Sequence, residues 1–332
     1  MISRLSYLIT ECTDPYRNLA VEEYLRQSVA ADEVIFFLWQ NKKTVVVGRN
    51  QNARRECNLA LLEYEGGHLA RRLSGGGAVF HDLGNLNFTF VAKDDNYSVP
   101  RQLAVIIRAF NSIGINAEKT GRNDIVTDGR KCVGNAFLSK DGTSCHHGSI
   151  LYDVKMDDLS KYLTVNQQKL QAKGVQSVRS RVINLKEINS CLTLNELQDS
   201  LKLAFCAEYS LPCADYNFSA EAEEKIAAFT RFFASEEHRF GKDIAFGYEL
   251  SHRFNWGEIQ IQIQGGPRTV KQAQIYSDAL EPDLIASLSK LLLGSEISNE
   301  AFACAIEKAQ VNNENEQIII NELTAWLRNP NA

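Results

Sequence analysis

The chain has 332 residues, enough for one large domain or two unequal ones. Hydrophobic residues make up 44% and charged residues 23%, as in ordinary globular proteins, and no apolar run approaches the roughly 20 residues that cross a bilayer. The net charge of −5 argues against a nucleic-acid partner. Eight scattered cysteines without a C-x-x-C pair suggest neither a zinc ribbon nor a dithiol redox site, and they fit reduced thiols. Because no signal-peptide core follows Met1, we expect a cytoplasmic protein without a membrane partner.

The first part of the chain predicts a helix and several short strands. Asp14-Pro15 is typical of a helix start, and a helix of two or three turns is expected through Leu25. β-Branched and aromatic runs predict strands at 34–39 and 44–47. A short helix over 59–65 and strands near 68–73, through Phe80-His81 and over 86–92 complete this part.

The segment from Arg71 to Asp82 contains three consecutive glycines directly after two arginines and Leu-Ser. Glycines at positions that must be ordered indicate positive φ or a ligand against the backbone. Exposed amide N–H groups beside guanidinium groups suit a phosphate or carboxylate, whereas the alternative is a solvated glycine-rich loop. The glycines lie in or beside a sheet and match neither G-x-x-x-x-G-K-[ST] nor G-x-G-x-x-G, which excludes those two phosphate motifs.

The middle of the chain predicts a helix, a hairpin and a strand. Apolar residues at helical spacing predict a helix over 103–113 that ends at Gly114. Asp128-Gly129 predicts a tight turn joining strands at 125–126 and 132–133, with Lys131 on a strand just past the turn. Neighbouring strand residues face opposite ways, so Cys132 is expected to be a packed thiol, and His146 and His147 cannot both serve one metal site.

The remainder predicts a loop, then helices, then a second domain. Residues 171–185 are basic and small and indicate an extended loop, and helical patterns follow near 194–209 and 219–234. Isoleucine alternates with glutamine over 259–264, which predicts a strand, and helices are expected at 284–292, 299–311 and 316–328. We therefore expect a catalytic domain over 1–246 and a small accessory domain over 250–332. Without a coiled-coil seam, a monomer is favoured.

Several separated motifs together resemble those of bacterial lipoate–protein ligase A. They are RRLSGGGAVFHDLGNLNFTF (71–90), GRNDIVTDGRKCVGNA (121–136), HHGSILYD (146–153) and KGVQSVRSRVINL (173–185), with support from DPYRNLAVEEYL (14–25) and VVVGRNQNARREC (45–57). The resemblance extends over essentially the whole chain. It implies the α+β biotin/lipoate-ligase fold, related to class II aminoacyl-tRNA synthetases, with a small α+β C-terminal accessory domain.

The resemblance also implies a reaction in two steps. Lipoate and ATP, the latter with Mg²⁺, form lipoyl-AMP and pyrophosphate, and the lipoyl group then passes to a lysine of a carrier domain. The implied carriers are E2 subunits of 2-oxoacid dehydrogenases and the glycine-cleavage H protein. No tightly bound cofactor is expected.

Site residues are implied by position within the matching motifs. Lys131 matches the key lysine, a point charge able to bridge the lipoate carboxylate and the α-phosphate. For the adenylate the resemblance implies Lys131 together with Arg72, Gly77, Ala78, Val79, Phe80, Asn123 and Asp124. For lipoate it implies Arg71, Lys131, His81 and His147, although structural roles for the histidines stay open. Asp124 is the candidate oxygen ligand for magnesium.

Two departures and several alternatives remain. Leu73 and the segment Cys132 to Ala136 differ from common family residues, which affects substrate fine-tuning but leaves the charged residues intact. A lipoyltransferase that uses preformed lipoyl-AMP shares this fold, and an octanoyl or lipoyl transferase without ATP is a second rival. A non-catalytic lipoate or adenylate binder is a third. Biotin ligase fits less well, because its glycine-rich motif differs.

Overall fold

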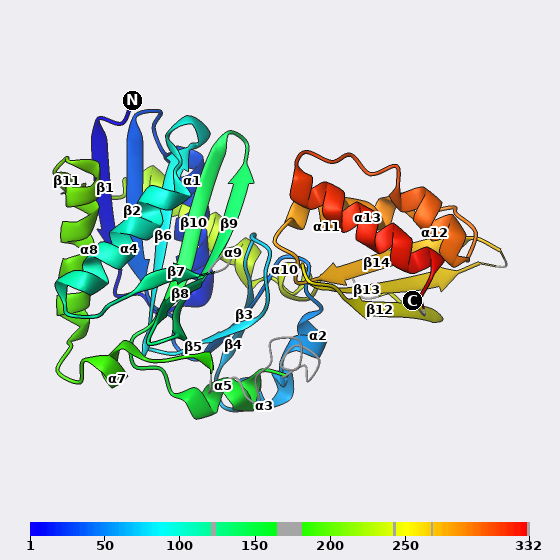
Figure 1. The fold of residues 1–332 in the computed structure, drawn as a ribbon, viewed down its shortest axis with the longest axis horizontal. Coiled ribbons are helices and arrows are strands. Elements are labelled where there is room, and N and C mark those ends of the chain that lie inside the picture. Colours follow the sequence, from blue (N-terminus) through cyan, green and yellow to red (C-terminus); the bar gives the residue numbers. More distant parts are fainter. Residues whose placement is uncertain (121–123, 165–180, 242–243, 267, 331–332) are drawn as a thin grey trace. The chain divides into compact units, whose positions relative to one another are not determined.

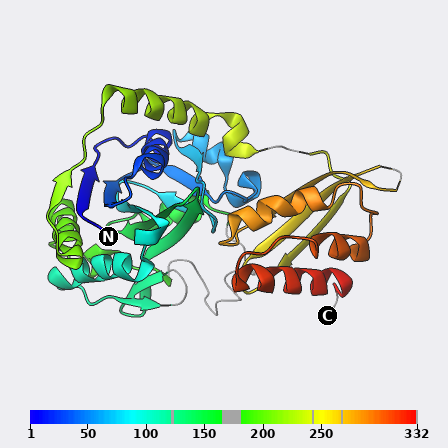
Figure 2. The same cartoon turned by 90° about the horizontal axis from the view of Figure 1, so that it is seen from above.

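The computed structural model describes residues 1–120, 124–164, 181–241, 244–266 and 268–330 (Figures 1 and 2). It divides into two compact units. The first unit comprises Met1–Val46, Cys57–Arg71 and Val79–Arg239, and the second comprises Val47–Glu56, Arg72–Ala78 and Phe240–Ala332. Among the described residues, no helix combines the length and the apolar character needed to cross a membrane.

An eight-stranded sheet is the centre of the first unit, in the order β11-β1-β2-β6-β10-β9-β8-β7. β1 pairs in parallel with β11 and β2, and the strands from β2 through β6, β10, β9 and β8 to β7 pair antiparallel. The strands are β1 (Arg4–Ile9), β2 (Glu33–Trp39), β6 (Asn85–Lys93), β7 (Glu118–Thr120), β8 (Asp124–Thr127), β9 (Arg130–Lys140), β10 (Thr143–Leu151) and β11 (Cys213–Asp215).

Helices cover both faces of this sheet (Figure 1). On one face α4 (Val99–Ser112) and α8 (Leu194–Tyr209) pack together over alternate residues of the strands, and Phe36, Phe90 and Phe205 meet in the core. On the other face α1 (Pro15–Ser28) contacts β6 and β10 and lies beside α9 (Ala220–Ala234). Asp14 caps α1 by accepting hydrogen bonds from the backbone amides of Tyr16 and Arg17, as its sequence predicts.

A second, three-stranded sheet of order β4-β3-β5 contains the strands that come before and after the glycine-rich segment in the chain. Its strands are β3 (Thr44–Val47), β4 (His68–Arg71) and β5 (Val79–His81). Short elements complete the unit, namely α3 (Leu59–Tyr64), η1 (Asp94–Asn96), α5 (Met156–Tyr162), α7 (Leu185–Ile188) and α10 (Glu236–Phe240).

The second unit has its own antiparallel sheet, order β12-β13-β14, and its own apolar core. The core joins Ile259, Ile261 and Ile263 of β13 to α11 and to the two helices after it. The elements are α2 (Ala53–Glu56), β12 (Tyr248–Arg253), β13 (Glu258–Gly265), β14 (Val270–Ser277), α11 (Pro282–Leu291), α12 (Asn299–Ile306) and α13 (Glu314–Arg328). Gln260 and Gln262 on the other face of β13 are also buried, because their amides donate to Glu249 at 2.8 and 2.9 Å.

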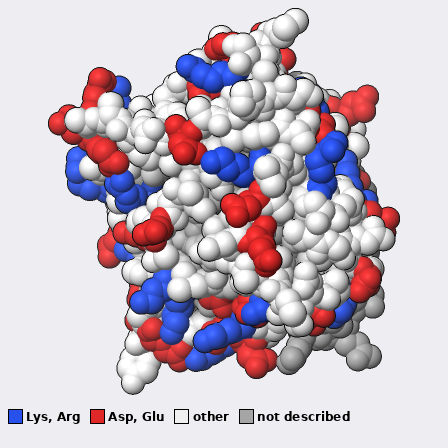
Figure 3. Space-filling model, turned by 90° about the vertical axis from the view of Figure 1, so that its left-hand side faces the viewer, with Lys and Arg blue, Asp and Glu red and all other residues white. Residues whose placement is uncertain are grey.

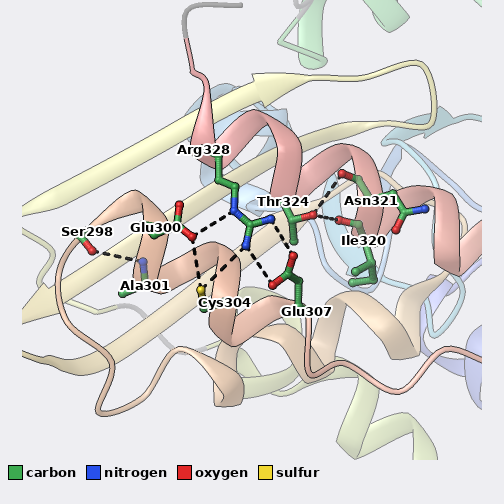
Figure 4. A network of polar contacts seen from close by, with 9 residues as sticks. All are labelled: Ser298, Glu300, Ala301, Cys304, Glu307, Ile320, Asn321, Thr324 and Arg328. Carbon is green, nitrogen blue, oxygen red and sulfur yellow. Dashed lines mark hydrogen bonds and ion pairs between the residues drawn. The ribbon is translucent and has the colours of Figure 1, made fainter.

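Arg328 ties the last helix of the second unit to α12 (Figure 4). Its guanidinium forms a bidentate pair with Glu307, at 2.7 and 3.0 Å, and donates to Glu300 at 3.1 Å. The Glu307 and Glu300 carboxylates raise the pKa of Arg328. The network is exposed, so it fixes the pairing of the helices more than it adds to stability.

Opposite charges are interspersed on the face shown in Figure 3. Ion pairs of this kind join α8 to β11 through Lys202 and Asp215, at 2.9 Å, and α4 to α8 through Arg108 and Glu208, at 3.3 Å. A surface of mixed sign does not present the one-sign field that attracts a polyanion.

The observed mixed architecture confirms the predicted α+β class. The helix over 103–113, the strands at 34–39 and 44–47 and the strand at 259–264 are present with bounds close to those predicted. α1 extends about a turn further than predicted, to Ser28. The sequence reading missed β1, β12 and β14, and the loop predicted at 171–185 lies mostly outside the described residues.

Candidate active site

Lys131 lies where the first unit's hairpin of β8 and β9 begins its return strand. The turn residues Asp128 and Gly129 have φ of 50° and 69°, the left-handed pair that a two-residue hairpin turn requires, and this confirms the predicted turn. The backbone carbonyl of Lys131 accepts a hydrogen bond from the Ile183 amide at 2.9 Å. A neighbouring segment therefore holds the lysine backbone in place.

A β-bulge decides where the Lys131 side chain points. Val126 pairs with Lys131 and Ile125 pairs with Val133, so Cys132 is the extra residue. Cys132 and Val133 are consequently both in the hydrophobic core. The strand alternation resumes after them, which brings Gly134 to the same face as Lys131.

Gly134 gives the Lys131 amine its space. A β-carbon at Gly134 would lie 2.9 Å from Lys131 Nζ and 3.0 Å from Cε, so the aliphatic end of the lysine lies over the glycine. Nζ is 2.6 Å from Oδ1 of Asp124. The distance makes this an ion pair, although its angles do not meet those of a hydrogen bond. Both side chains stay partly exposed, so the amine is accessible on the sheet face.

Cys132 is a packed thiol, as predicted. It is fully buried, and its Sγ–H donates to the Ile125 carbonyl at 3.4 Å. Burial raises the pKa of the Cys132 thiol to about 12. Because the thiolate is the nucleophilic form, this cysteine is unreactive at neutral pH.

His146 and His147 face opposite sides of the sheet, as the strand rule predicted. His146 lies in the aromatic core against Phe88, Phe90 and Phe137. His147 is on the face that carries the Lys131 amine, and its Nδ1 is 3.0 and 2.9 Å from the two carboxylate oxygens of Glu22 in α1.

Glu22 also organises the strands beside His147. The Thr89 hydroxyl donates to Glu22 Oε2 at 2.6 Å, and the Trp39 indole N–H donates to Thr89 at 3.2 Å. His81 packs edge-on against Trp39, with ring centroids 6.2 Å apart, and its Nδ1 is 3.2 Å from the Asn41 amide. The two predicted histidines are thus connected through Trp39, Thr89 and Glu22.

The two arginines of the glycine-rich segment belong to different units. In the first unit, the Arg71 guanidinium donates to the carbonyls of His238 and Arg239 at 2.8 to 3.0 Å. Val79 of β5 is 37% exposed, whereas Phe80 is buried against Tyr162. Arg71 therefore links β4 to the backbone of α10.

Arg72, Gly77 and Ala78 belong to the second unit. The Arg72 guanidinium donates to the carbonyls of Gly75 and Gly77, both at 2.8 Å, and to the Ser74 hydroxyl at 3.1 Å. Gly76 has φ of 91°, and its N–H donates to the Ala279 carbonyl at 3.1 Å. A β-carbon on Gly75 would lie 2.3 Å from that same oxygen. The glycines are thus needed because the loop backbone lies very close to the backbone at Ala279 inside this unit. The hydrogen bonds of the Arg72 guanidinium hold the loop in this conformation.

The donor set for a cation at this site is small. Asp124 offers one carboxylate, and the described part of the chain contains no cluster of three or more metal-ligating side chains. A single carboxylate fits magnesium that arrives with nucleotide phosphates, because phosphates and water supply most of its ligands. Asn123, the other predicted nucleotide contact, lies outside the described residues.

Sequence reasoning missed Glu22, Thr89 and Gly134 as parts of the site. Glu22 appeared only as a residue of the predicted helix, and Thr89 as one of a strand. Gly134 lies within the matching hairpin motif, but its importance follows from the bulge at Cys132. The contact between the helical Glu22 and the strand residue His147 can be recognised only once the packing of the helix on the sheet is known.

Two family profiles match successive parts of the chain. A profile for the lipoyl protein ligase A/B catalytic domain matches residues 14–206, and one for the bacterial lipoate protein ligase C-terminus matches residues 243–327. A crystal structure of P. falciparum LipL1 in complex with lipoate is 27% identical, with a TM-score of 0.84 over 97% of this chain and 99% of that chain.

Two further solved structures are similar over about three quarters of this chain. A bi-partite lipoate protein ligase from Thermoplasma acidophilum, described with its E2 lipoyl domain, is 26% identical, with a TM-score of 0.65 over 74% of this chain and 100% of that chain. Lipoate-protein ligase A bound with ATP is 25% identical, with a TM-score of 0.64 over 73% of this chain and 99% of that chain. Since the catalytic-domain profile spans more than half of the sequence, the chain belongs to the lipoate–protein ligase family, enzymes of lipoate ligation.

Proposed function

We propose that the protein is an ATP-dependent lipoate–protein ligase that forms lipoyl-AMP and transfers the lipoyl group to a lysine of a carrier domain. The observation that carries the proposal is the Lys131 ammonium, held over Gly134 and beside Asp124 on an accessible sheet face. Relatives bound with lipoate and with ATP support both substrates.

The first step joins two anions, so its barrier is mainly one of charge and alignment. A lipoate carboxylate oxygen attacks the α-phosphorus of ATP, the new P–O bond forms, and the bond to pyrophosphate breaks. The Lys131 ammonium, a compact point charge, attracts both the carboxylate and the α-phosphate. Asp124 holds the amine in place through its ion pair at 2.6 Å.

The second step is an aminolysis. The carrier lysine amine attacks the acyl carbonyl of lipoyl-AMP, a C–N bond forms, the C–O bond breaks with AMP as the leaving group, and the proton lost by the amine passes to solvent. Lys131 stabilises the oxygen on which negative charge develops, so one side chain serves both steps. His147 and Glu22 shape the face beside it.

The remaining predicted contacts complete the proposal. Arg72 and the backbone of Gly77, Ala78, Val79 and Phe80 are assigned to the nucleotide phosphates, with Asn123 and Asp124. Magnesium enters as the MgATP co-substrate, with Asp124 as its protein ligand. Arg71, His81 and His147 are assigned to the lipoate side.

Partners and organisation follow from the same proposal. A relative described together with its E2 lipoyl domain supports lipoyl domains of E2 subunits as acceptors, and the glycine-cleavage H protein is the second proposed acceptor. The proposed division is a catalytic domain over 1–246 and an accessory domain over 250–332, in a cytoplasmic monomer.

Lipoate-dependent exchange of labelled pyrophosphate into ATP tests the proposal. The ligase exchanges with lipoate, and adding a lipoyl domain yields a lipoylated lysine, seen as a mass increase. A folded enzyme that lipoylates only when given lipoyl-AMP is a lipoyltransferase. Acylation from an acylated carrier without ATP identifies the acyl transferase, and binding without acylation identifies a binding protein.

A further inference from the structure

A straight row of residues crosses the first unit's large sheet at the site. The strand register pairs Trp39 with Asn87, Asn87 with Ser149, Ser149 with Gly134, and Gly134 with Asp124. Residues directly opposite each other in adjacent strands point to the same face. Asn87 alternates with the core residues Leu86 and Phe88, so its side chain is on the face where the Lys131 amine lies over Gly134.

Asn87 stands out in this row because its side chain is buried and unpaired. The residue is 1% exposed, and neither its amide nitrogen nor its carbonyl oxygen has a hydrogen-bond partner among the described residues. A buried polar group without a partner is destabilising, and native proteins rarely keep one without a reason.

The neighbours of Asn87 have partners of their own. The Trp39 indole N–H donates to Thr89 at 3.2 Å, and the Ser149 hydroxyl oxygen accepts from Asn85 Nδ2 at 2.9 Å. The Asn87 carboxamide, which has no hydrogen-bond partner among the described residues, is therefore the group in this row that can bind a ligand on this face. Both a donor and an acceptor are available on it.

The distance along the row indicates which part of a ligand meets Asn87. Neighbouring strands are about 4.8 Å apart, so Asn87 lies two strand spacings, about 10 Å, from Gly134 and the Lys131 amine above it. An acyl group whose carboxylate is held by Lys131 reaches this distance with the far end of a medium-length chain. Asn87 thus meets the tail of the acyl group and not its carboxyl end.

The chemistry of the tail gives Asn87 a role. The lipoyl tail ends in a ring with two sulfur atoms, which are weak hydrogen-bond acceptors, whereas the octanoyl tail offers no acceptor. An octanoyl chain would leave the buried amide unpaired, and a site with a buried polar group discriminates against an analogue that lacks its partner. We propose that Asn87 is a specificity-determining residue, whose amide N–H donates to a ring sulfur and favours lipoate over octanoate. This proposal rests on the proposed function for the position of the acyl chain.

The test compares wild type with Asn87→Leu, an apolar side chain of similar volume. Three acids are used, namely lipoate, octanoate, and the carbocyclic analogue of lipoate in which methylene groups replace both sulfurs. Dissociation constants are measured by calorimetry without ATP, and kcat/KM by pyrophosphate exchange. We expect wild type to prefer lipoate over the carbocyclic acid by about ten-fold, and Asn87→Leu to lose most of that preference by weakening lipoate alone.

Each outcome bears on the proposal. Equal preference in wild type and Asn87→Leu overturns it, as does a wild type that binds lipoate and the carbocyclic acid equally. An equal loss for all three acids assigns Asn87 a purely structural role and also overturns it. If Asn87→Leu melts far below wild type, Asn87→Ser replaces it in the same comparison. Binding without pyrophosphate exchange contradicts the proposed function, while the calorimetric preference still decides the role of Asn87.

Discussion

The Lys131 amine occupies the space that a side chain on Gly134 would need, since a β-carbon there would lie 2.9 Å from Nζ. The two residues share a face only because Cys132 forms a bulge between them. A glycine three residues after the lysine is therefore a requirement of the site and not of the backbone, because Gly134 has no positive φ.

Gly134→Ala tests this relationship. The new methyl group displaces the flexible end of Lys131, so we expect kcat/KM for pyrophosphate exchange to fall by about ten-fold or more while the fold persists. Little loss of stability is expected, because the closest atoms belong to a side-chain end that can move. Exchange rates and thermal melting of the purified variant measure the two effects.

Gly247→Ala is the matched control. A β-carbon at Gly247 meets nothing within 4 Å, and this glycine belongs to the second unit, so activity and melting temperature should stay at wild-type values. Unchanged activity in Gly134→Ala would show that the lysine acts from another position.

Lys131→Ala removes the charge itself. The loss of an electrostatic stabiliser in both steps predicts a fall of about 10²–10³ in kcat for lipoylation. Lys131→Arg should not restore activity, because the planar guanidinium needs more space over Gly134 than an ammonium. Steady-state lipoylation of a lipoyl domain measures both variants.

Cys132→Ala separates the charge from the neighbouring thiol. The thiol is in the core and its pKa is raised to about 12, so this variant should keep nearly wild-type activity. A folded but inactive Cys132→Ala enzyme would identify the thiol as a nucleophile and contradict the role given to Lys131.

Local patterns predicted much of this site, and pairing between segments determined the rest. Asp128-Gly129 predicted the hairpin because two residues with positive φ have a strong composition signal. Strand alternation correctly placed the Cys132 side chain on the other face of the sheet from Lys131. The same rule would also place Gly134 on that other face, which is wrong, because Gly134 shares the face of Lys131. The bulge depends on the register with β8, and one strand alone does not reveal it.

Tertiary contacts explain the other omissions. Glu22 lies on a predicted helix, yet its contact with His147 depends on how α1 packs across β10. β1 has only a short apolar run, and its pairing with β2 and β11 makes it a strand. The unpaired carboxamide of Asn87 is visible only once burial and hydrogen bonds are known.

His146 predicts a specific dependence of stability on pH. Burial, with a smaller contribution from His147, lowers the pKa of His146 from 6.5 to about 3 in the folded protein. The unfolded chain therefore binds a proton near pH 6.5 that the folded chain does not bind until about pH 3. Stability from this residue is complete above pH 6.5 and is lost as the pH falls towards 3.

Denaturant unfolding near pH 7.5 and near pH 5.5 measures this dependence. Wild type should lose about 1.4 kcal/mol more over that interval than His146→Gln, which cannot titrate but keeps a polar side chain between Gln102 and Asn135. Equal pH dependence in the two proteins would mean that His146 is protonated in the folded state.

Cys206 and Cys213 give the last prediction, because their sulfur atoms are 3.0 Å apart, between the end of α8 and the edge strand β11. Glutathione disulfide should convert the pair into an intramolecular disulfide. One thiolate displaces glutathione to form a mixed disulfide, and the second displaces another glutathione. Burial, and then Cys206, raise the pKa of Cys213 to about 11, so the thiolate is scarce at neutral pH and the reaction should accelerate as the pH rises.

Mass spectrometry distinguishes this bond from simple glutathionylation. The oxidised pair loses two hydrogen atoms and keeps no glutathione, whereas the exposed Cys191 and Cys304 should gain glutathione. The short loop predicts a gain of about 2 kcal/mol in the free energy of unfolding, which Cys206→Ser should abolish under the same oxidising conditions. Glutathione retained on Cys206 or Cys213 would contradict the prediction, since neighbouring thiols at this distance resolve a mixed disulfide more readily than solvent-exposed single thiols do.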